Sequence, residues 1–135
     1  HDTALIIVSD LPASSEKTSL LSRLSDVQDI IDQIAAQEVI NTINLLPSIG
    51  SIELTDEIAI VDARSAYNAL STNQQALVTN LSTLVAAENQ WIALDAATDA
   101  VILAESTPTQ GNHDAAQALI TILADGTPKQ ALHNL

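Results

Sequence analysis

Glycine and proline are so few in this chain that long stretches lack any strong breaker of regular structure. The sequence has 3 Gly and 4 Pro in 135 residues. They fall in four places, at Pro12, within Leu46–Ser51, within Thr107–Asn112 and at Gly126–Pro128. Because Gly and Pro are the strongest signals for turns, the chain between these places is expected to run as continuous regular elements.

The apolar residues between the breaks recur at intervals of three and four, as in Leu20, Leu24, Val27, Ile31 and Ile34. Such spacing lines one face of an α-helix. It predicts a helix over Glu16–Leu46 that packs through this apolar stripe and its continuation through Val39, Ile40 and Ile43. A bend is expected near residues 35–37, where the stripe changes face.

Two further helix starts carry capping signals. Thr55 precedes two acids, which predicts a helix start because a hydroxyl caps the first turn and acids complement the helix dipole. Ser71, with Gln74 three residues later, has the pattern of a capping box. A last long helix is predicted over Leu81–Glu105, and Ile52 is expected to hold a connecting loop on the core.

The apolar side chains are almost all aliphatic. Hydrophobic residues make up 47% of the chain, yet it has no Phe, Met or Cys, and Tyr67 and Trp91 are its only aromatic residues. Aliphatic side chains fit narrow helix–helix contacts and offer little material for an aromatic-walled ligand pocket. The lack of Cys excludes disulfides, thiolate metal sites and a Cys nucleophile.

The chain is strongly acidic, with a net charge of −13 from 17 acids and 4 bases. This charge disfavours nucleic acid and anionic membrane surfaces as partners, because both require clustered Lys and Arg. No apolar run is long enough for membrane insertion. Asp26, Asp29 and Asp32 fall off the apolar stripe and are expected to form a solvated face. No cofactor is expected, and weak calcium binding between packed copies is the alternative role for such acids.

No set of residues typical of catalysis is present. The sequence has no Gly-rich phosphate loop, no nucleophile elbow and no His placed near a Ser and an acid. His1, His113 and His133 do not have the spacing of a zinc motif, so they are expected at polar surfaces or helix starts. We therefore expect that the protein is not an enzyme.

The segment from His113 onward matches the start of the chain. With His113 placed on His1, an offset of 112 positions, six pairs of residues are identical. The six in the later segment are His113, Asp114, Ala116, Leu123, Lys129 and Leu132. The chain is thus interpreted as one full repeat and the opening of the next, with a chance match as the alternative. Such repeats stack end to end, which makes the equivalent His1 and His113 candidates for an interface.

Together these patterns predict an all-α fold, as an elongated up-and-down helical bundle of three-helix-type units in tandem. Residues 1–46 are expected to form a first unit with a short and a long helix, and residues 47–112 a second unit that completes the bundle. Residues 113–135 are expected to start the next repeat or to serve as an assembly segment.

Arg64 is the best single candidate for a special role, because it lies on a helix whose other face is apolar. Glu88 is placed to reach it across a helix pair, and the favoured interpretation is a partly buried ion pair that fixes helix register. Ligand binding by Arg64 is the alternative. Tyr67 is expected to pack its ring inward, and Trp91 to lie at the core edge or at an interface between modules.

Several stretches, taken in order along the chain, follow the pattern of one known kind of helical repeat. They are Ile43–Pro47, Ile52–Asp56, Val61–Leu70, Gln74–Asn80 and Leu84–Glu88, with a second, shorter unit at Leu11–Leu24. These stretches, above all Ala63-Arg64-x-x-Tyr67 and Val78-Thr79-Asn80, resemble helical repeat modules of Gram-positive bacterial cell-wall and S-layer-associated surface proteins. Those repeats are usually rich in Lys, whereas this chain has only Lys17 and Lys129.

The resemblance implies a non-catalytic structural module that is secreted and displayed at the cell surface. It would act as a tandem spacer, or as a self-assembling subunit of a surface layer or filament. Its partners would be copies of itself, neighbouring repeats or other surface proteins. The alternative is a helical-bundle adhesin that binds a host or cell-wall ligand.

Overall fold

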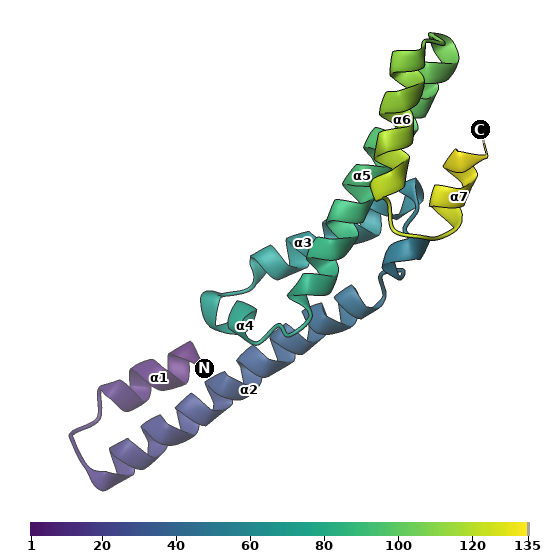
Figure 1. The fold of residues 1–135 in the computed structure, drawn as a ribbon. Coiled ribbons are helices and arrows are strands. Elements are labelled where there is room, and N and C mark those ends of the chain that lie inside the picture. Colours follow the sequence, from purple (N-terminus) through teal and green to yellow (C-terminus); the bar gives the residue numbers. More distant parts are fainter. Residues whose placement is uncertain (135) are drawn as a thin grey trace.

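The computed structural model describes residues 1–134, and this part of the chain contains helices and connections but no strand. The α-helices are α1 (Asp2–Ser9), α2 (Ser15–Asn44), α3 (Glu57–Ala69), α4 (Thr72–Ala76), α5 (Leu81–Ser106), α6 (Gln110–Ile122) and α7 (Thr127–His133). Two short 3₁₀ turns, η1 (Ile49–Ser51) and η2 (Leu54–Asp56), link α2 to α3. The predicted all-α class is confirmed, and Figure 1 shows the helices arranged along one long axis.

The longest element, α2, begins where the sequence predicts. Ser14 precedes the helix in an extended conformation, and its hydroxyl accepts a hydrogen bond from the Lys17 backbone N–H at 3.1 Å. This cap satisfies one of the N–H groups that have no partner inside the helix. The 30 residues of α2 correspond to about 45 Å, and the helix continues unbroken through residues 35–37.

The predicted stripe of α2 is exposed in the first half of the helix, and its continuation is buried in the second half. Val27, Ile31 and Ile34 are exposed, whereas Val39 and Ile43 are buried, together with Asp32 and Ala36. The reason lies in the neighbours of α2. Its first half contacts only the short α1, and α4 then approaches from the side of Asp32 rather than from the side of the stripe.

Two clusters of buried side chains lie one after the other along the axis. The first joins the second half of α2, Ile52, α3, Val78 and the first half of α5. The second joins the second half of α5 to α6, with Leu132 of α7 packed against it. Because α5 contributes to both clusters, one rigid helix connects the two halves of the molecule (Figure 1).

The connections follow the capping signals in part. Ser71 caps α4 as predicted, accepting from the Gln74 N–H at 3.3 Å while the Gln74 side chain accepts from the Ser71 N–H at 3.0 Å. The prediction that Thr55 caps α3 is wrong. Thr55 lies inside η2, and the Asp56 carboxylate accepts from the Glu53 N–H at 2.8 Å, because the 3₁₀ turn moves the helix start to Glu57.

The linker between α2 and α3 is held on the core by Ile52, which is fully buried as expected. Next to it, the backbones of Gly50 and Gly126 meet. A Cβ atom built on Gly126 would collide with the Gly50 carbonyl, and one on Gly50 would collide with the Asp125 carbonyl. Both positions therefore require glycine for the close approach of η1 to the start of α7.

Candidate functional site

The seam between α3 and α5 contains the residues singled out in the sequence as a possible special site. Arg64 Nε donates to Glu88 Oε1 at 2.6 Å, and Arg64 Nη2 pairs with Glu88 Oε2 at 2.5 Å. The two side chains are 29% and 24% exposed. The hydrogen bonds to Glu88 raise the pKa of Arg64 above its ordinary value, against the opposing effect of burial. The guanidinium also lies 5.6 Å from the centre of the Tyr67 ring.

Trp91 lies farther along the same seam and is half-buried. Its indole N–H donates to the Leu54 carbonyl at 3.1 Å, which ties α5 to η2. An open groove of about 350 Å³ runs past Arg64, Glu88 and Trp91. The side chains of all three form hydrogen bonds within the chain. The seam is therefore interpreted as a structural contact between helices.

The N-terminal hairpin, formed by α1 and the start of α2, is held by one lysine. The Lys17 ammonium donates to the backbone carbonyls of Ser9 and Leu11, both at 2.8 Å. These carbonyls belong to the end of α1 and the turn after it, where the helix leaves acceptors without partners. Lys17 therefore closes the turn from inside the hairpin.

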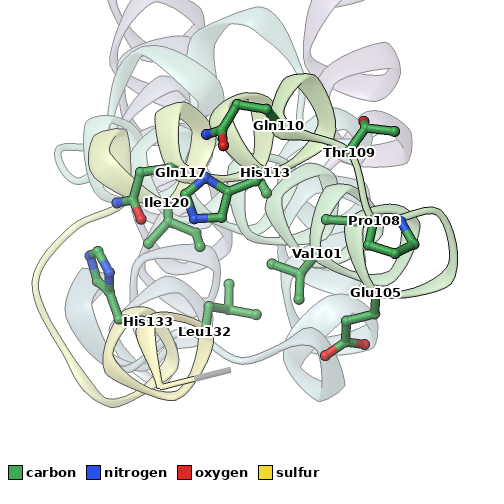
Figure 2. A pocket seen from close by; sticks show the side chains of 12 residues that line it. Val101, Glu105, Pro108, Thr109, Gln110, His113, Gln117, Ile120, Leu132 and His133 are labelled. Carbon is green, nitrogen blue, oxygen red and sulfur yellow. The ribbon is translucent and has the colours of Figure 1, made fainter.

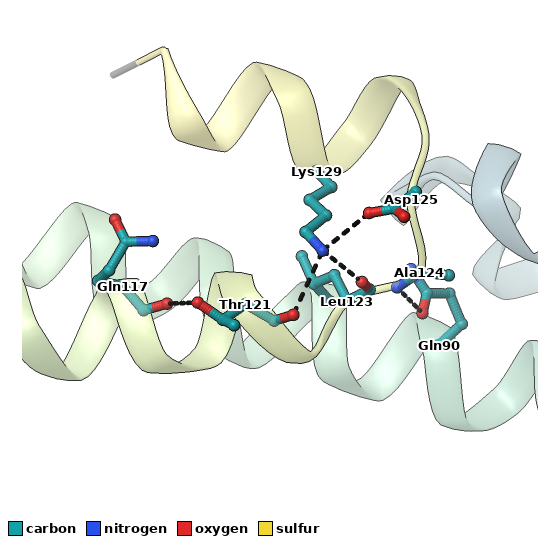
Figure 3. A network of polar contacts seen from close by, with 7 residues as sticks. All are labelled: Gln90, Gln117, Thr121, Leu123, Ala124, Asp125 and Lys129. Atoms are coloured by element: carbon teal, nitrogen blue, oxygen red, sulfur yellow. Dashed lines mark hydrogen bonds and ion pairs between the residues drawn. The ribbon is translucent and has the colours of Figure 1, made fainter.

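The C-terminal hairpin, formed by α6 and α7, is held in the same way. The Lys129 ammonium donates to the Thr121 carbonyl at 3.2 Å and to the Leu123 carbonyl at 2.9 Å, as Figure 3 shows. These residues are the equivalents of Lys17, Ser9 and Leu11 at the offset of 112 positions. The two lysines thus make the same pair of hydrogen bonds at the same register.

The two hairpins differ in their turns and where the second one contacts the rest of the molecule. Lys129 also pairs with the Asp125 carboxylate at 3.0 Å, whereas the equivalent position in the first hairpin is Ala13. The Ala124 N–H donates to the side-chain carbonyl of the buried Gln90 at 3.1 Å (Figure 3), whereas its equivalent, Pro12, has no N–H. Gly126 lies against Gly50, whereas its equivalent Ser14 uses a side chain to cap α2. The shared residues are thus those that hold each hairpin together internally.

His1 and His113 occupy equivalent positions in the two hairpins, His1 before α1 and His113 in the first turn of α6. Each ring contacts the following Asp, with Nδ1–Oδ1 distances of 3.4 Å for His1–Asp2 and 3.1 Å for His113–Asp114. His1 also contacts the Leu24 carbonyl through Nε2 at 3.0 Å. The structure therefore does not bring the two histidines together, and each belongs to its own hairpin.

The surroundings of the two histidines differ in burial. The His1 side chain is 16% exposed and the His113 side chain is 69% exposed. Hydrogen bonds from His113 and from Gln110 lower the pKa of the Asp114 carboxyl. Among residues 1–134, Asp114 is the only hydrogen-bond partner found for the His113 ring.

A cavity lies beside His113, lined by residues of α5, α6 and α7. It has a volume of about 520 Å³ and is open to solvent between α5, α6 and α7. Figure 2 shows the His113 ring directed into it from α6, with Leu132 and His133 of α7 on the opposite side. Val101, Ala116 and Ile120 supply buried apolar lining, whereas Glu105 and Gln117 are exposed at its edge.

The acidic residues on α2 are not all solvated. Asp32 is 7% exposed, and its carboxylate accepts from Gln28 at 2.8 Å and from Gln74 at 2.9 Å. The expectation of a solvated face is therefore wrong for Asp32, because α4 covers it. Within residues 1–134, no group of three His, Asp or Glu side chains is arranged to hold a metal ion.

Two amides that hold elements together, the buried Gln90 and the partly buried Asn80, escaped the sequence analysis. Gln90 holds the turn before α7, as described above, and Asn80 donates from its side chain to the Ile40 carbonyl and to Asn44 Oδ1, both at 3.0 Å. Asn80 thereby satisfies acceptors near the end of α2. Neither residue carries a pattern that distinguishes it from a surface amide, since its partner lies more than thirty positions away.

Several large apolar side chains remain exposed on α1 and on α2. On α1 they are Leu5, Ile6 and Ile7, and on α2 they are Val27, Ile30, Ile31 and Ile34. The four residues of α2 share one helix face by their spacing, and we call them the α2 stripe. No helix in residues 1–134 is long and apolar enough to cross a membrane.

Searches against protein-family models, curated proteins and solved structures found no match to this chain.

Proposed function

We propose that the chain is a non-catalytic structural module of an extracellular surface protein, acting as a tandem spacer or as a self-assembling subunit of a surface layer or filament. The resemblance of its sequence to cell-wall and S-layer-associated repeats gives the setting. The module consists of α1 to α5, and the α6–α7 hairpin is the opening of the next copy.

The observation that carries this proposal is the agreement of the two lysine-closed turns. Lys17 and Lys129 donate to carbonyls that are equivalent at one constant offset. Six identities over a short segment are weak support, but a shared three-dimensional arrangement of donor and acceptors adds an independent agreement. Chains built from such units propagate their contacts to neighbours along one axis.

The direction of the helices supports propagation along a line. In Figure 1, α2 and α7 both run toward the upper right of the view. By equivalence with the N-terminal hairpin, α7 is the first part of a helix such as α2. A following unit would therefore extend the long axis of the molecule.

Self-association is supported by a different observation. The α2 stripe leaves four aliphatic side chains exposed on one helix face, each 40% exposed or more. Contiguous exposed apolar surface marks sites of contact with other molecules. If the occupant is a host or cell-wall ligand instead, the module is an adhesin, which is the alternative function.

A protein with two periods tests the proposal. It consists of residues 1–135 followed by residues 24–135, so that position 136 receives the residue found at position 24. Small-angle scattering should show a rod longer by at least about 45 Å, the length of α2, with unchanged helix content per residue in circular dichroism.

A control protein carries the same second segment with its order of apolar and polar residues shuffled. It should not lengthen as a rod. If the two-period protein has the same maximum dimension as the single chain, or behaves as a folded unit with a disordered tail, the tandem function is wrong.

A further inference from the structure

We infer that the cavity between α5, α6 and α7 is the seat of a helix that continues α7, and that His113 binds a backbone carbonyl of that helix. The inference rests on the proposed tandem function and specifies how one unit receives the next. The occupant is a helical segment with the sequence pattern of α2 from Leu24 onward, joined to α7 without a break.

The N-terminal hairpin gives the geometry of the complete contact. Lys17 of α2 meets the end of α1, while His1 at the start of α1 meets the Leu24 carbonyl. The two helices therefore run antiparallel and stay in contact along the whole of α1. In this arrangement the His1 side chain is only 16% exposed.

The C-terminal hairpin has the first part of this contact. Lys129 meets the end of α6, and Leu132 packs against the α5–α6 cluster. The described part of α7 ends at His133, the equivalent of Leu21. The position equivalent to Leu24 is 136, so the contact with His113 falls one turn beyond His133.

The cavity lies where that turn would run. It is bounded by His113 on α6 and by Leu132 and His133 on α7, as Figure 2 shows. Its buried apolar lining and its exposed edge residues Glu105 and Gln117 suit an amphipathic helix, which buries one face and keeps the other in water. The His113 side chain, 69% exposed, would then be covered by this helix as the His1 side chain, 16% exposed, is covered by α2.

The test uses the full chain extended after Leu135 by residues 24–35, compared with an extension of the same composition in shuffled order. The probe is the rate at which diethyl pyrocarbonate modifies His113, followed by mass spectrometry. The native-order extension should slow this reaction by at least about five-fold, the factor expected from one net hydrogen bond of typical strength. The shuffled extension should leave the rate unchanged.

A second variant tests the contact of His113 separately from the folding of the extension. In the native-order protein, His113→Ala should lower hydrogen-exchange protection of the extension by about five-fold, while its helix content in circular dichroism remains. Equal His113 modification in the native-order and shuffled proteins overturns the inference. A native-order extension that stays non-helical overturns it as well, because the seat would then fail to order its occupant.

The scattering experiment on the two-period protein separates this inference from the proposed function. If that protein lengthens while His113 stays reactive, the seat is wrong and the tandem function stands. If His113 is protected while the two-period protein stays short, the seat stands and the tandem function is wrong.

Discussion

Arg64 and Glu88 meet through two hydrogen bonds although they lie 24 positions apart, and each side chain is less than one third exposed. A bidentate pair fixes both the distance and the angle between two helices. Because α3 and α5 share an otherwise aliphatic contact, the pair is suited to select one register among several of similar packing energy.

A double-mutant cycle with Arg64→Ala and Glu88→Ala measures this pair. We expect a coupling free energy of about 1 kcal/mol, because the pair is bidentate and partly screened by solvent. Urea unfolding of the four proteins provides the values. A coupling within experimental error of zero would show that the pair contributes nothing to register.

Asp114 makes stability depend on pH in one direction. Hydrogen bonds from His113 and Gln110 lower its pKa below the ordinary value of 3.8, so the folded state favours the charged carboxylate. The resulting stabilisation is fully present above the ordinary pKa and is lost as pH falls through the lowered value. Asp114→Asn should therefore flatten part of the decrease in stability below pH 3.8.

Thermal unfolding of both proteins at a series of pH values checks this expectation, with Asp99→Asn as a matched control on exposed surface. Identical profiles for the native chain and for Asp114→Asn would contradict it.

Sequence patterns located some of these residues and missed others, for a physical reason. Arg64 was found because it is one of four bases and lies on a helix whose other face is apolar, which pointed to Glu88 on the facing helix. Asp32 was misplaced because its partners, Gln28 and Gln74, are neutral amides that carry no charge signal. A buried carboxylate satisfied by amides looks like any surface acid until the helix that covers it is known.

At the scale of elements, the two lysines provide matched tests of the hairpins. Lys129→Met keeps the length of the side chain and removes the donor to the carbonyls of Thr121 and Leu123, together with the ion pair to the exposed Asp125. We expect local destabilisation of about 1–2 kcal/mol, since two acceptors lose a charged donor and regain water. Hydrogen exchange should increase in α6 and α7 and stay unchanged in α3.

Lys17→Met is the counterpart and should increase hydrogen exchange in α1 and the start of α2. If either substitution increased hydrogen exchange in the other hairpin, the two hairpins would not be independent units. This result would contradict their interpretation as equivalent parts of two repeats.

The contact between Gly50 and Gly126 gives a second prediction for the elements. Gly126→Ala places a Cβ against the Gly50 carbonyl, so η1 and α7 must move apart. We expect a cost of about 1–3 kcal/mol, the range for overpacking a tight contact. Gly111→Ala is the control, because a Cβ there meets nothing within 4 Å.

Urea unfolding gives the free energies for both variants, and hydrogen exchange locates the change. A Gly126→Ala protein as stable as Gly111→Ala would show that the close approach is not needed to hold α7.

The positions of the helices followed from the sequence more closely than their contacts did. Turn residues and caps are local signals. The sequence could therefore predict the cap at Ser71 and, to within one residue, the extent of the helix Leu81–Ser106. Which face of α2 packs depends on α4, a five-residue helix that comes forty positions later. Apolar periodicity identifies a helix but does not say on which side its partners lie.

For the whole molecule, net charge and exposed apolar surface act against each other. A charge of −13 keeps copies apart, whereas the α2 stripe favours contact between them. Added salt screens the repulsion, with a Debye length of about 10 Å at 0.1 M. The average mass from light scattering should therefore increase with sodium chloride and with protein concentration.

The variant Ile30→Lys with Ile34→Lys should stay monomeric under the same conditions, while Ile58→Lys, on an exposed residue of α3, serves as control. Calcium and magnesium should act equally at equal ionic strength, since no three-ligand metal group exists in residues 1–134. A calcium-specific increase in mass would contradict screening as the cause.

The meeting of Gly50 and Gly126 also decides how the chain would carry tension. Pulled from α2 at one end and α7 at the other, the molecule is loaded first across the contact between η1 and the start of α7. Helices α3 to α6 form a loop of chain closed by that contact, and the contacts of α7 with α5 and α6 share the load. Once these contacts open, the loop is drawn into the line of pull and the chain lengthens abruptly, so the meeting of two glycines contributes to the force that the folded chain withstands.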